Sequence, residues 1–142
     1  MSEALPGVPA APPPFPARDA AAVVLWRRAA TGVEVFWLKR GERLSFAGGF
    51  FAFPGGKLDP ADADVPVAGA QGTAAALRVA AARELLEETG VLVARGAERL
   101  TQTQLDAARR GLLDGGLEFA RVLAEHALSL DARDFPEAGR WM

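Results

Sequence analysis

Two short runs near the start of the chain have hydrophobic patterns typical of strands: AAVVLWRR (21–28) is a compact apolar run that ends in two arginines, and VEVFWLKR (33–40) follows it. Both runs contain β-branched and aromatic residues, and the segment AATG (29–32) between them has turn character. The pattern therefore predicts a β-hairpin. In the second strand, alternation predicts two opposite faces, one with Val33, Val35 and Trp37 and the other with Glu34, Phe36 and Leu38.

A further strand and a turn are predicted downstream of the hairpin. After a loop at 41–49, FFAF (50–53) indicates a short strand, and PGGKLDP (54–60) is a dense turn signal. The segment DPADADVPVAGAQG (59–72) predicts an irregular excursion over the surface. We expect the aromatic side chains of the short strand to be core residues rather than a base-stacking platform, namely Phe50, Phe51 and Phe53.

Helical periodicity is strongest over AAALRVAAARELLEET (74–89), which is rich in strong helix formers. Thr73 is expected to cap the N-terminus of this helix, and Gly90 fits the position just after its end. Hydrophobic residues recur every fourth position and predict a buried stripe of Leu77, Ala81 and Leu85. The first part of the chain is thus predicted to form three strands followed by a long helix.

The remaining segments predict one more strand and two more helices. VLVAR (91–95) indicates a strand, and TQTQLDAARRGLLDG (101–115) begins with a capping-box pattern at Thr101 and Gln104. LEFARVLAEHALSL (117–130) has helical periodicity, whereas the final residues from 131 are loop-like, with Trp141 at the start of a further strand. The order of elements predicts an α/β fold.

Composition excludes several kinds of site. The chain has 142 residues, is 50% hydrophobic and carries a formal net charge of −2, which indicates one globular domain without a general attraction to nucleic acid. The absence of cysteine excludes disulfides and thiolate nucleophiles. Since the single histidine, His126, excludes sites that need two, a metal would require oxygen ligands. We expect His126 itself to be an exposed or capping residue.

The chain carries no sequence signal for a membrane or for secretion. No apolar run approaches the roughly 18 residues that a membrane helix needs, and the N-terminus lacks the pattern of a signal peptide. Residues 1–18 are rich in proline and alanine and predict a disordered tail before a domain at 19–142. The expected location is cytoplasmic.

Residues 83–91, RELLEETGV, contain an electrostatic conflict. Glu87 and Glu88 lie three and four positions after Glu84, a spacing at which like charges repel by about 0.2–0.5 kcal/mol per pair. They also lie at the negative end of the helix dipole, which disfavours carboxylates. A solvated helix face is the ordinary explanation for exposed glutamates. The other is a cation site opposite Gly55 and Gly56, whose missing Cβ atoms permit close approach of a metal or phosphate.

The same segment resembles the core of the Nudix box, G-x5-E-x7-R-E-U-x-E-E-x-G-U, in which U is aliphatic. Arg83, Glu84, Leu85, Glu87, Glu88, Gly90 and Val91 occupy its last seven specified places, and FAFPGGK upstream is also typical of the Nudix family. The resemblance covers residues 50–91. It implies an α/β Nudix fold, with a mixed sheet between helices, and a metal-dependent hydrolase.

The resemblance also implies roles for individual residues. Glu84, Glu87 and Glu88 would bind Mg²⁺ or Mn²⁺, with the carbonyl of Gly56 as a further ligand, and Arg83 would hold the glutamate rotamers. The reaction would be attack of water on the diphosphate of a nucleoside diphosphate linked to another moiety. Gly55 and Gly56 would contact substrate. Lys39 and Arg40 either contact its phosphates or form a charged strand end.

Two departures concern the substrate. Ala75 stands where the Nudix pattern has an upstream glutamate, and the insertion at 59–72 is similar to that of the branch with peroxisomal coenzyme A diphosphatases. This similarity implies coenzyme A or an acyl-CoA as substrate. The alternative is a non-catalytic nucleotide sensor or an inactive fragment. Within the insertion, Asp59, Asp62 and Asp64 lack calcium-loop spacing and predict a solvated loop.

Few β-prone residues follow position 95. Because the resemblance implies that later strands complete the sheet, we expect a truncated chain or one completed by another chain. Such a product would be weakly stable or homo-oligomeric, and weakly active. The expected partner is a small nucleotide substrate, with no nucleic acid and no membrane.

Overall fold

The computed structural model describes residues 18–39, 41 and 49–140. The strands in these ranges are β1 (Ala20–Ala22), β2 (Trp26–Ala29), β3 (Gly32–Val35), β4 (Leu38–Lys39), β5 (Phe51–Ala52), β6 (Gly55–Lys57), β7 (Val67–Ala68) and β8 (Leu130–Asp131). The helices are α1 (Gly72–Thr89), α2 (Gln102–Leu113) and α3 (Phe119–Glu125), with short 3₁₀ segments η1 (Pro60–Asp64), η2 (Ala97–Arg99) and η3 (Ala132–Asp134). The α/β composition agrees with the prediction.

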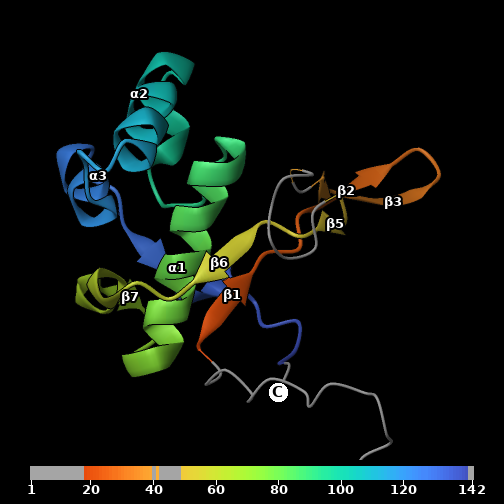
Figure 1. Cartoon of the computed structure of the whole chain (residues 1–142), viewed down its shortest axis with the longest axis horizontal. Helices are drawn as coiled ribbons and strands as arrows, with labels where there is room; N and C mark the ends of the chain where they lie inside the picture. Colours follow the sequence, from red (N-terminus) through yellow and green to blue (C-terminus); the bar gives the residue numbers. More distant parts are fainter. Residues whose placement is uncertain (1–17, 40, 42–48, 141–142) are drawn as a thin grey trace, which may run out of the picture.

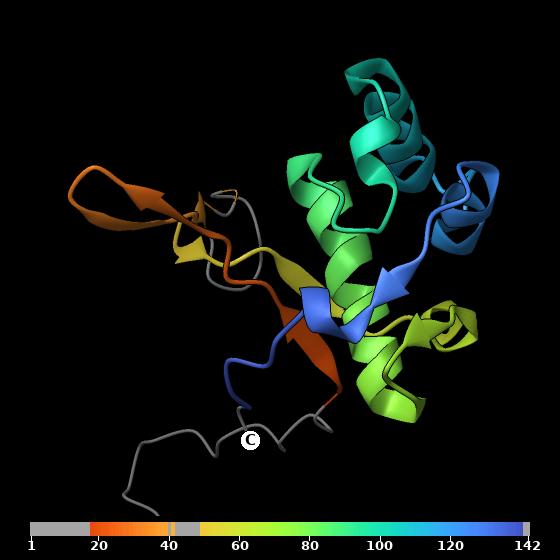
Figure 2. The same ribbon diagram turned by 180° about the vertical axis from the view of Figure 1, so that it is seen from behind.

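Helix α1 lies at the centre of the molecule and contacts both the strands and the other helices. It packs against β1 and β6 on one side and against α2, β7 and η1 elsewhere (Figures 1 and 2). The strands pair two by two, antiparallel in β1–β6, β2–β3 and β4–β5 and parallel in β7–β8. The parallel pair brings the region just before α1 beside the region after α3.

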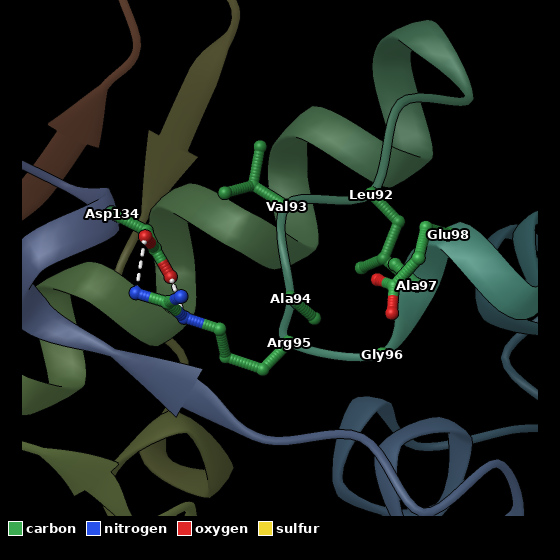
Figure 3. A pocket seen from close by; sticks show the side chains of 8 residues that line it. All are labelled: Leu92, Val93, Ala94, Arg95, Gly96, Ala97, Glu98 and Asp134. Atoms are coloured by element: carbon green, nitrogen blue, oxygen red, sulfur yellow. Dashed lines mark hydrogen bonds and ion pairs between the residues drawn. The ribbon is translucent and has the colours of Figure 1, made fainter.

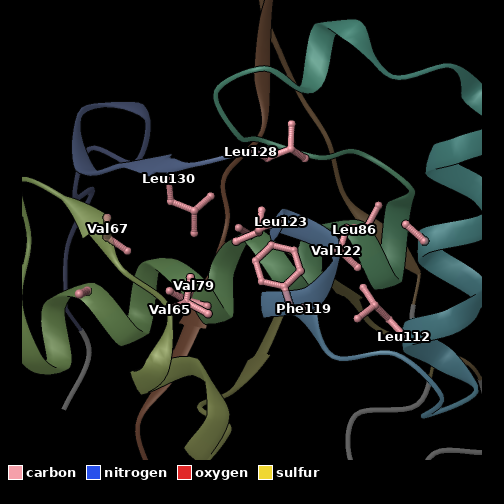
Figure 4. Packing of buried hydrophobic residues seen from close by; sticks show 13 residues of the cluster. Val65, Val67, Val79, Leu86, Leu112, Phe119, Val122, Leu123, Leu128 and Leu130 are labelled. Atoms are coloured by element: carbon pink, nitrogen blue, oxygen red, sulfur yellow. The ribbon is translucent and has the colours of Figure 1, made fainter. Parts of the chain in front are cut away.

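The hydrophobic core joins α1 to the C-terminal helices. Val79 and Leu86 of α1 are fully buried in one cluster with Leu112 of α2 and with Phe119 and Val122 of α3 (Figure 4). Ala81 and Leu85 of the predicted stripe are buried outside this cluster, whereas Leu77 is half-buried. Because α1 packs on two sides, its buried surface is wider than the predicted stripe.

The predicted hairpin is confirmed, although its apolar face is exposed. Strand β2 pairs with β3 from Trp26–Val35 to Ala29–Gly32, and the hairpin projects away from the three helices (Figures 1 and 2). Every residue of β3 is exposed. The cross-strand ion pair between Arg27 and Glu34, 2.6 Å, lies on the opposite face from Trp26 and Val35.

The expectation that the aromatic strand is part of the core is wrong for two of its residues. Phe50 and Phe51 are 69% and 63% exposed, because the β4–β5 ladder lies beside the projecting hairpin and away from the helices. Phe53 is half-buried, and its ring lies 4.4 Å from that of Trp37.

The turn predicted at 54–60 instead contains a short strand at its centre. Gly55–Lys57 form β6 and pair with β1, so that Gly56 lies opposite Ala21. A Cβ atom at Gly55 would overlap the carbonyl oxygen of Ala21. Gly55 therefore permits the close approach of two backbones, and a sequence pattern of turn residues does not distinguish this use of glycine from a turn.

The segment 59–72 is more ordered than a surface excursion. It contains η1 and β7, and it buries Val65 and Val67 in the core. Asp62 is 2% exposed, so the prediction of a solvated loop is wrong for this residue. Asp59 and Asp64 are exposed, as predicted.

Several element boundaries differ from the pattern. Helix α1 begins two residues early, with Gln71 at the N-cap position in place of Thr73, because Gly72 starts the first turn. VLVAR is not a strand: only Arg95 forms a bridge, to Ser129. The last predicted helix ends at Glu125, since Leu130 and Asp131 pair with β7 instead.

Three predictions about the ends of helices are confirmed. Gly90 is left-handed, with a φ of 79°, and donates to the carbonyl of Leu86 at 2.9 Å. The capping box of Thr101 and Gln104 is formed. His126 is half-buried at the C-cap of α3. Arg40, Trp141 and residues 1–17 lie outside the described residues, and no described helix is long and apolar enough to span a membrane.

Candidate active site

The last two turns of α1 place their charged side chains against strand β6. Glu84 and Glu87 are half-buried, whereas Glu88 is exposed. A Cβ atom at Gly56 would overlap the carboxylate of Glu84. The Glu88 carboxylate accepts a hydrogen bond of 2.8 Å from the backbone N–H of Gly55. The structure thus brings Glu84 and Glu88 against the predicted glycine pair, whereas the side chain of Glu87 contacts Arg83.

Arg83 connects three carboxylates. Its Nη1 donates to Glu84 at 2.9 Å and is 3.5 Å from Glu87. Its Nε and Nη2 donate to the two oxygens of Asp62, at 2.9 and 3.0 Å, and Nη2 also donates to the carbonyl of Lys57 at 3.1 Å. These contacts use all five N–H donors of the guanidinium.

Around Arg83, negatively charged side chains outnumber positively charged ones, and the pKa values of the residues reflect this. Hydrogen bonding to Asp62 raises the pKa of Arg83 above its already high ordinary value, with Glu84 adding to the effect. Burial raises the pKa of Glu87, partly offset by the positive charge of Arg83, while nearby Glu84 raises it further. Three carboxylates surround one guanidinium, so the group is electrostatically suited to one more cation.

A second arginine, Arg109 of α2, lies behind the glutamates. Its Nε donates to the backbone carbonyl of Glu87 at 2.8 Å and its Nη2 to that of Glu88 at 3.1 Å. These carbonyls belong to the last turn of α1, where cations are favoured. Sequence reasoning missed this residue, because nothing in the spacing of α2 shows that it reaches the end of α1.

The donor chemistry of the site fits Mg²⁺ or Mn²⁺, which prefer oxygen ligands. Glu84, Glu87 and Glu88 supply carboxylates, and the missing Cβ of Gly56 lets the Glu84 carboxylate lie directly against β6. In the described part of the chain, no three acidic or histidine side chains converge in an arrangement that could hold a metal ion. Protein donors from Arg83 and Gly55 engage the glutamates in this conformation.

Two other predicted residues lie apart from this group. Lys39 ends β4, where it pairs with Phe51 in a separate ladder, and Arg40 is outside the described residues. An open cavity of about 820 Å³ lies past the end of α1, lined by residues 92–98 and Asp134 (Figure 3). Its Arg95 is paired with Asp134 at 2.6 Å, and the lining includes none of the predicted site residues.

Comparison with known proteins identifies the family. The NUDIX domain model matches residues 16–124. The structure is similar to the crystal structure of a NUDIX hydrolase from Alicyclobacillus acidocaldarius, with a TM-score of 0.55 and 30% sequence identity over 80% of this chain. The chain spans 56% of the length of that hydrolase, and no curated protein matches it. The family match and the structural similarity together show that the chain belongs to the NUDIX family and has its α/β fold.

Proposed function

We propose that this protein is a metal-dependent hydrolase that cleaves the diphosphate of a nucleoside diphosphate linked to another moiety. The observation that carries the proposal is that Arg83 joins the carboxylates of Glu84 and Glu87, while Glu84 packs against Gly56 of β6 and Glu88 accepts a hydrogen bond from Gly55. Membership of the NUDIX family and similarity to a solved NUDIX hydrolase support the hydrolytic class.

Glu84, Glu87 and Glu88 would hold Mg²⁺ or Mn²⁺, with the carbonyl of Gly56 as a further oxygen donor. When bound, the ion neutralises phosphate charge and acidifies a coordinated water. Arg83 keeps the carboxylates of Glu84 and Glu87 oriented by sharing its Nη1 between them. A fixed orientation before the ion arrives lowers the cost of assembling the site.

The glycines of β6 would give substrate phosphate access to the backbone. The carboxylate of Glu84 fills the space that a Cβ at Gly56 would take, so this proposed metal ligand can lie directly against the β6 backbone only because the Cβ is absent. Lys39 and Arg40 follow on the chain from the hairpin and are proposed to attract substrate phosphates as cations.

Coenzyme A and acyl-CoA are the narrower substrates that we propose, and the insertion at 59–72 together with Ala75 supports them. The test is a panel of coenzyme A, an acyl-CoA, a dinucleoside diphosphate and a sugar nucleotide, each incubated with Mg²⁺ or Mn²⁺. We expect metal-dependent release of a nucleoside monophosphate product from at least one of them. Retention of a panel compound with metal present and without turnover would instead identify a nucleotide sensor.

A further inference from the structure

Asp62 is a buried carboxylate that lies outside the three glutamates at the end of α1 and has no part in the proposed function. Its side chain is 2% exposed, and it comes from η1, in the segment between β6 and α1. One oxygen accepts from Arg83 Nε at 2.9 Å. The other accepts from Arg83 Nη2 at 3.0 Å and from the backbone N–H of Asp59 at 2.8 Å.

The bidentate contact divides the guanidinium of Arg83 into two sides. Nε and Nη2 face Asp62 and the carbonyl of Lys57, so they are unavailable to the glutamates. Nη1 alone faces Glu84 and Glu87. Because the guanidinium is planar and rigid, fixing two of its nitrogens also fixes the position of the third. The spacing of Glu84 and Glu87 around Nη1 therefore depends on a residue that touches neither of them.

We propose that Asp62 is a positioning residue for the metal-binding carboxylates and that it acts through Arg83. The inference rests on the proposed function, since the glutamates are taken as the metal ligands. Asp62 holds Arg83 so that only one nitrogen competes with the ion for glutamate oxygens. Without Asp62, the guanidinium is free to turn two nitrogens toward Glu84 and Glu87, which blocks the oxygens that the ion needs.

A role confined to η1 is the competing explanation for this aspartate. Asp62 completes a capping box with Asp59, and that contact alone would stabilise the 3₁₀ turn. However, the bond to the Asp59 N–H uses one oxygen, while the contacts to Arg83 use both. The two explanations differ in one measurable respect: only the positioning role requires Arg83.

The experiment measures Mn²⁺ binding to the full chain by electron paramagnetic resonance without substrate. We expect Asp62→Asn to weaken Mn²⁺ binding by about 10- to 100-fold, the range that supporting contacts of metal ligands contribute. Asp64→Asn is the matched control, because it removes the same charge from an exposed position in the same 3₁₀ segment. This control should bind Mn²⁺ like the unchanged chain.

A double-mutant cycle shows whether Asp62 acts through Arg83. We expect Asp62→Asn combined with Arg83→Gln to bind Mn²⁺ no more weakly than Arg83→Gln alone. The double variant removes both partners of the buried Asp62–Arg83 pair. Its comparison with Arg83→Gln can therefore still be made if Asp62→Asn alone fails to fold. As a readout independent of metal, the Nε–H resonance of Arg83 should exchange slowly with solvent in the unchanged chain and quickly in Asp62→Asn.

Additive losses in the cycle, or equal Mn²⁺ affinity in Asp62→Asn and Asp64→Asn, would overturn the inference. Failure of the unchanged chain to bind Mn²⁺ would overturn both the inference and the proposed metal dependence. Mn²⁺ binding without turnover of any panel compound would overturn the proposed function alone, because the cycle is measured without substrate.

Discussion

Among single residues, Arg83 and Arg109 resolve the charge conflict at the end of α1. Arg83 places its guanidinium between Glu84 and Glu87, and Arg109 donates to the backbone carbonyls of Glu87 and Glu88. One arginine therefore offsets the side-chain charges and the other offsets the helix dipole. Glu88, the exposed member, bonds instead to the backbone of β6.

Replacement of Glu88 by glutamine tests the metal site at its most accessible carboxylate. Glu88→Gln keeps an oxygen that can accept from Gly55 but removes a charge, so we expect Mn²⁺ affinity and turnover to fall by more than about tenfold. Without metal, the variant should be as stable as the unchanged chain or slightly more stable, because like-charge repulsion and the dipole conflict are relieved. Mn²⁺ titration and thermal unfolding measure the two effects. Glu98→Gln is the control, because Glu98 is exposed and lies after the end of α1. Full activity of Glu88→Gln at limiting Mg²⁺ would contradict the proposal that Glu88 binds the metal.

Gly56 tests the close approach of β6 to α1. We expect Gly56→Val to reduce turnover far more than it reduces the unfolding temperature, because the new side chain would occupy the place of the Glu84 carboxylate. A flexible glutamate can move aside, which preserves the fold but displaces a proposed ligand. Gly116→Val is the control, since a Cβ there meets nothing within 4 Å. Near-normal kinetics in Gly56→Val would show that Gly56 is an ordinary strand residue.

Among the elements, β8 and η3 are held together by a local ion pair. The Asp131 carboxylate accepts from the backbone N–H of Arg133 at 3.0 Å and from its guanidinium, and Arg95 lies 3.8 Å away. Hydrogen bonds from the Arg133 side chain and backbone lower the pKa of Asp131 well below its ordinary value. Because β8 pairs with β7, this carboxylate stabilises the end of the parallel ladder.

The lowered pKa of Asp131 predicts a pH dependence of stability. A carboxyl group whose pKa is lower in the folded state stabilises the fold above its unfolded pKa of about 4, and this contribution is lost as the pH falls toward the folded value. We therefore expect Asp131→Asn to be less stable than the unchanged chain at neutral pH and to show a smaller loss of stability below about pH 4. Urea unfolding at a series of pH values measures this, with the exposed Asp64→Asn as control. If the free energy of unfolding changed with pH in the same way for Asp131→Asn and the unchanged chain, the prediction that ionised Asp131 stabilises the fold would be wrong.

At the scale of the whole molecule, most of the large hydrophobic side chains that are exposed among the described residues lie in or beside the hairpin and the β4–β5 ladder. Trp26, Val33 and Val35 are 61%, 57% and 41% exposed, and Phe50 and Phe51 continue the apolar surface. A two-stranded hairpin is marginally stable in water, and an uncovered apolar face with free strand edges favours association. The helical body, in contrast, encloses its own core.

We expect the 142-residue chain to self-associate through the hairpin. Sedimentation velocity over a range of concentrations should show oligomers, and Trp26→Ser combined with Val35→Thr should shift the distribution toward monomer. Leu113→Ser is the control, because this residue is 58% exposed on α2, away from the hairpin. A monomer at all concentrations, with a cooperative unfolding transition and robust turnover, would show that the short chain is stable by itself.

Local patterns were sufficient wherever neighbouring residues decide the structure. The helix at 74–89, its glycine cap, the hairpin and the capping box at Thr101 all follow from periodicity and backbone preference within a few positions. The position of Glu84, Glu87 and Glu88 on neighbouring ridges at the end of the helix was also predictable from helical spacing alone, whereas their role as metal ligands stays a prediction. The family followed from the same nine-residue segment and the glycine pair before it.

Contacts between distant segments decided the rest. Gly55 and Gly56 are in a strand only because β1 approaches them, and Asp62 is buried only because Arg83, which lies 21 positions further along the chain, pairs with it. VLVAR has strand propensity but, apart from the Arg95 bridge, no strand partner among the described residues. Arg109 reaches the end of α1 across the interface between two helices. Such pairings depend on which segments meet in space, and local periodicity contains no information about the partner.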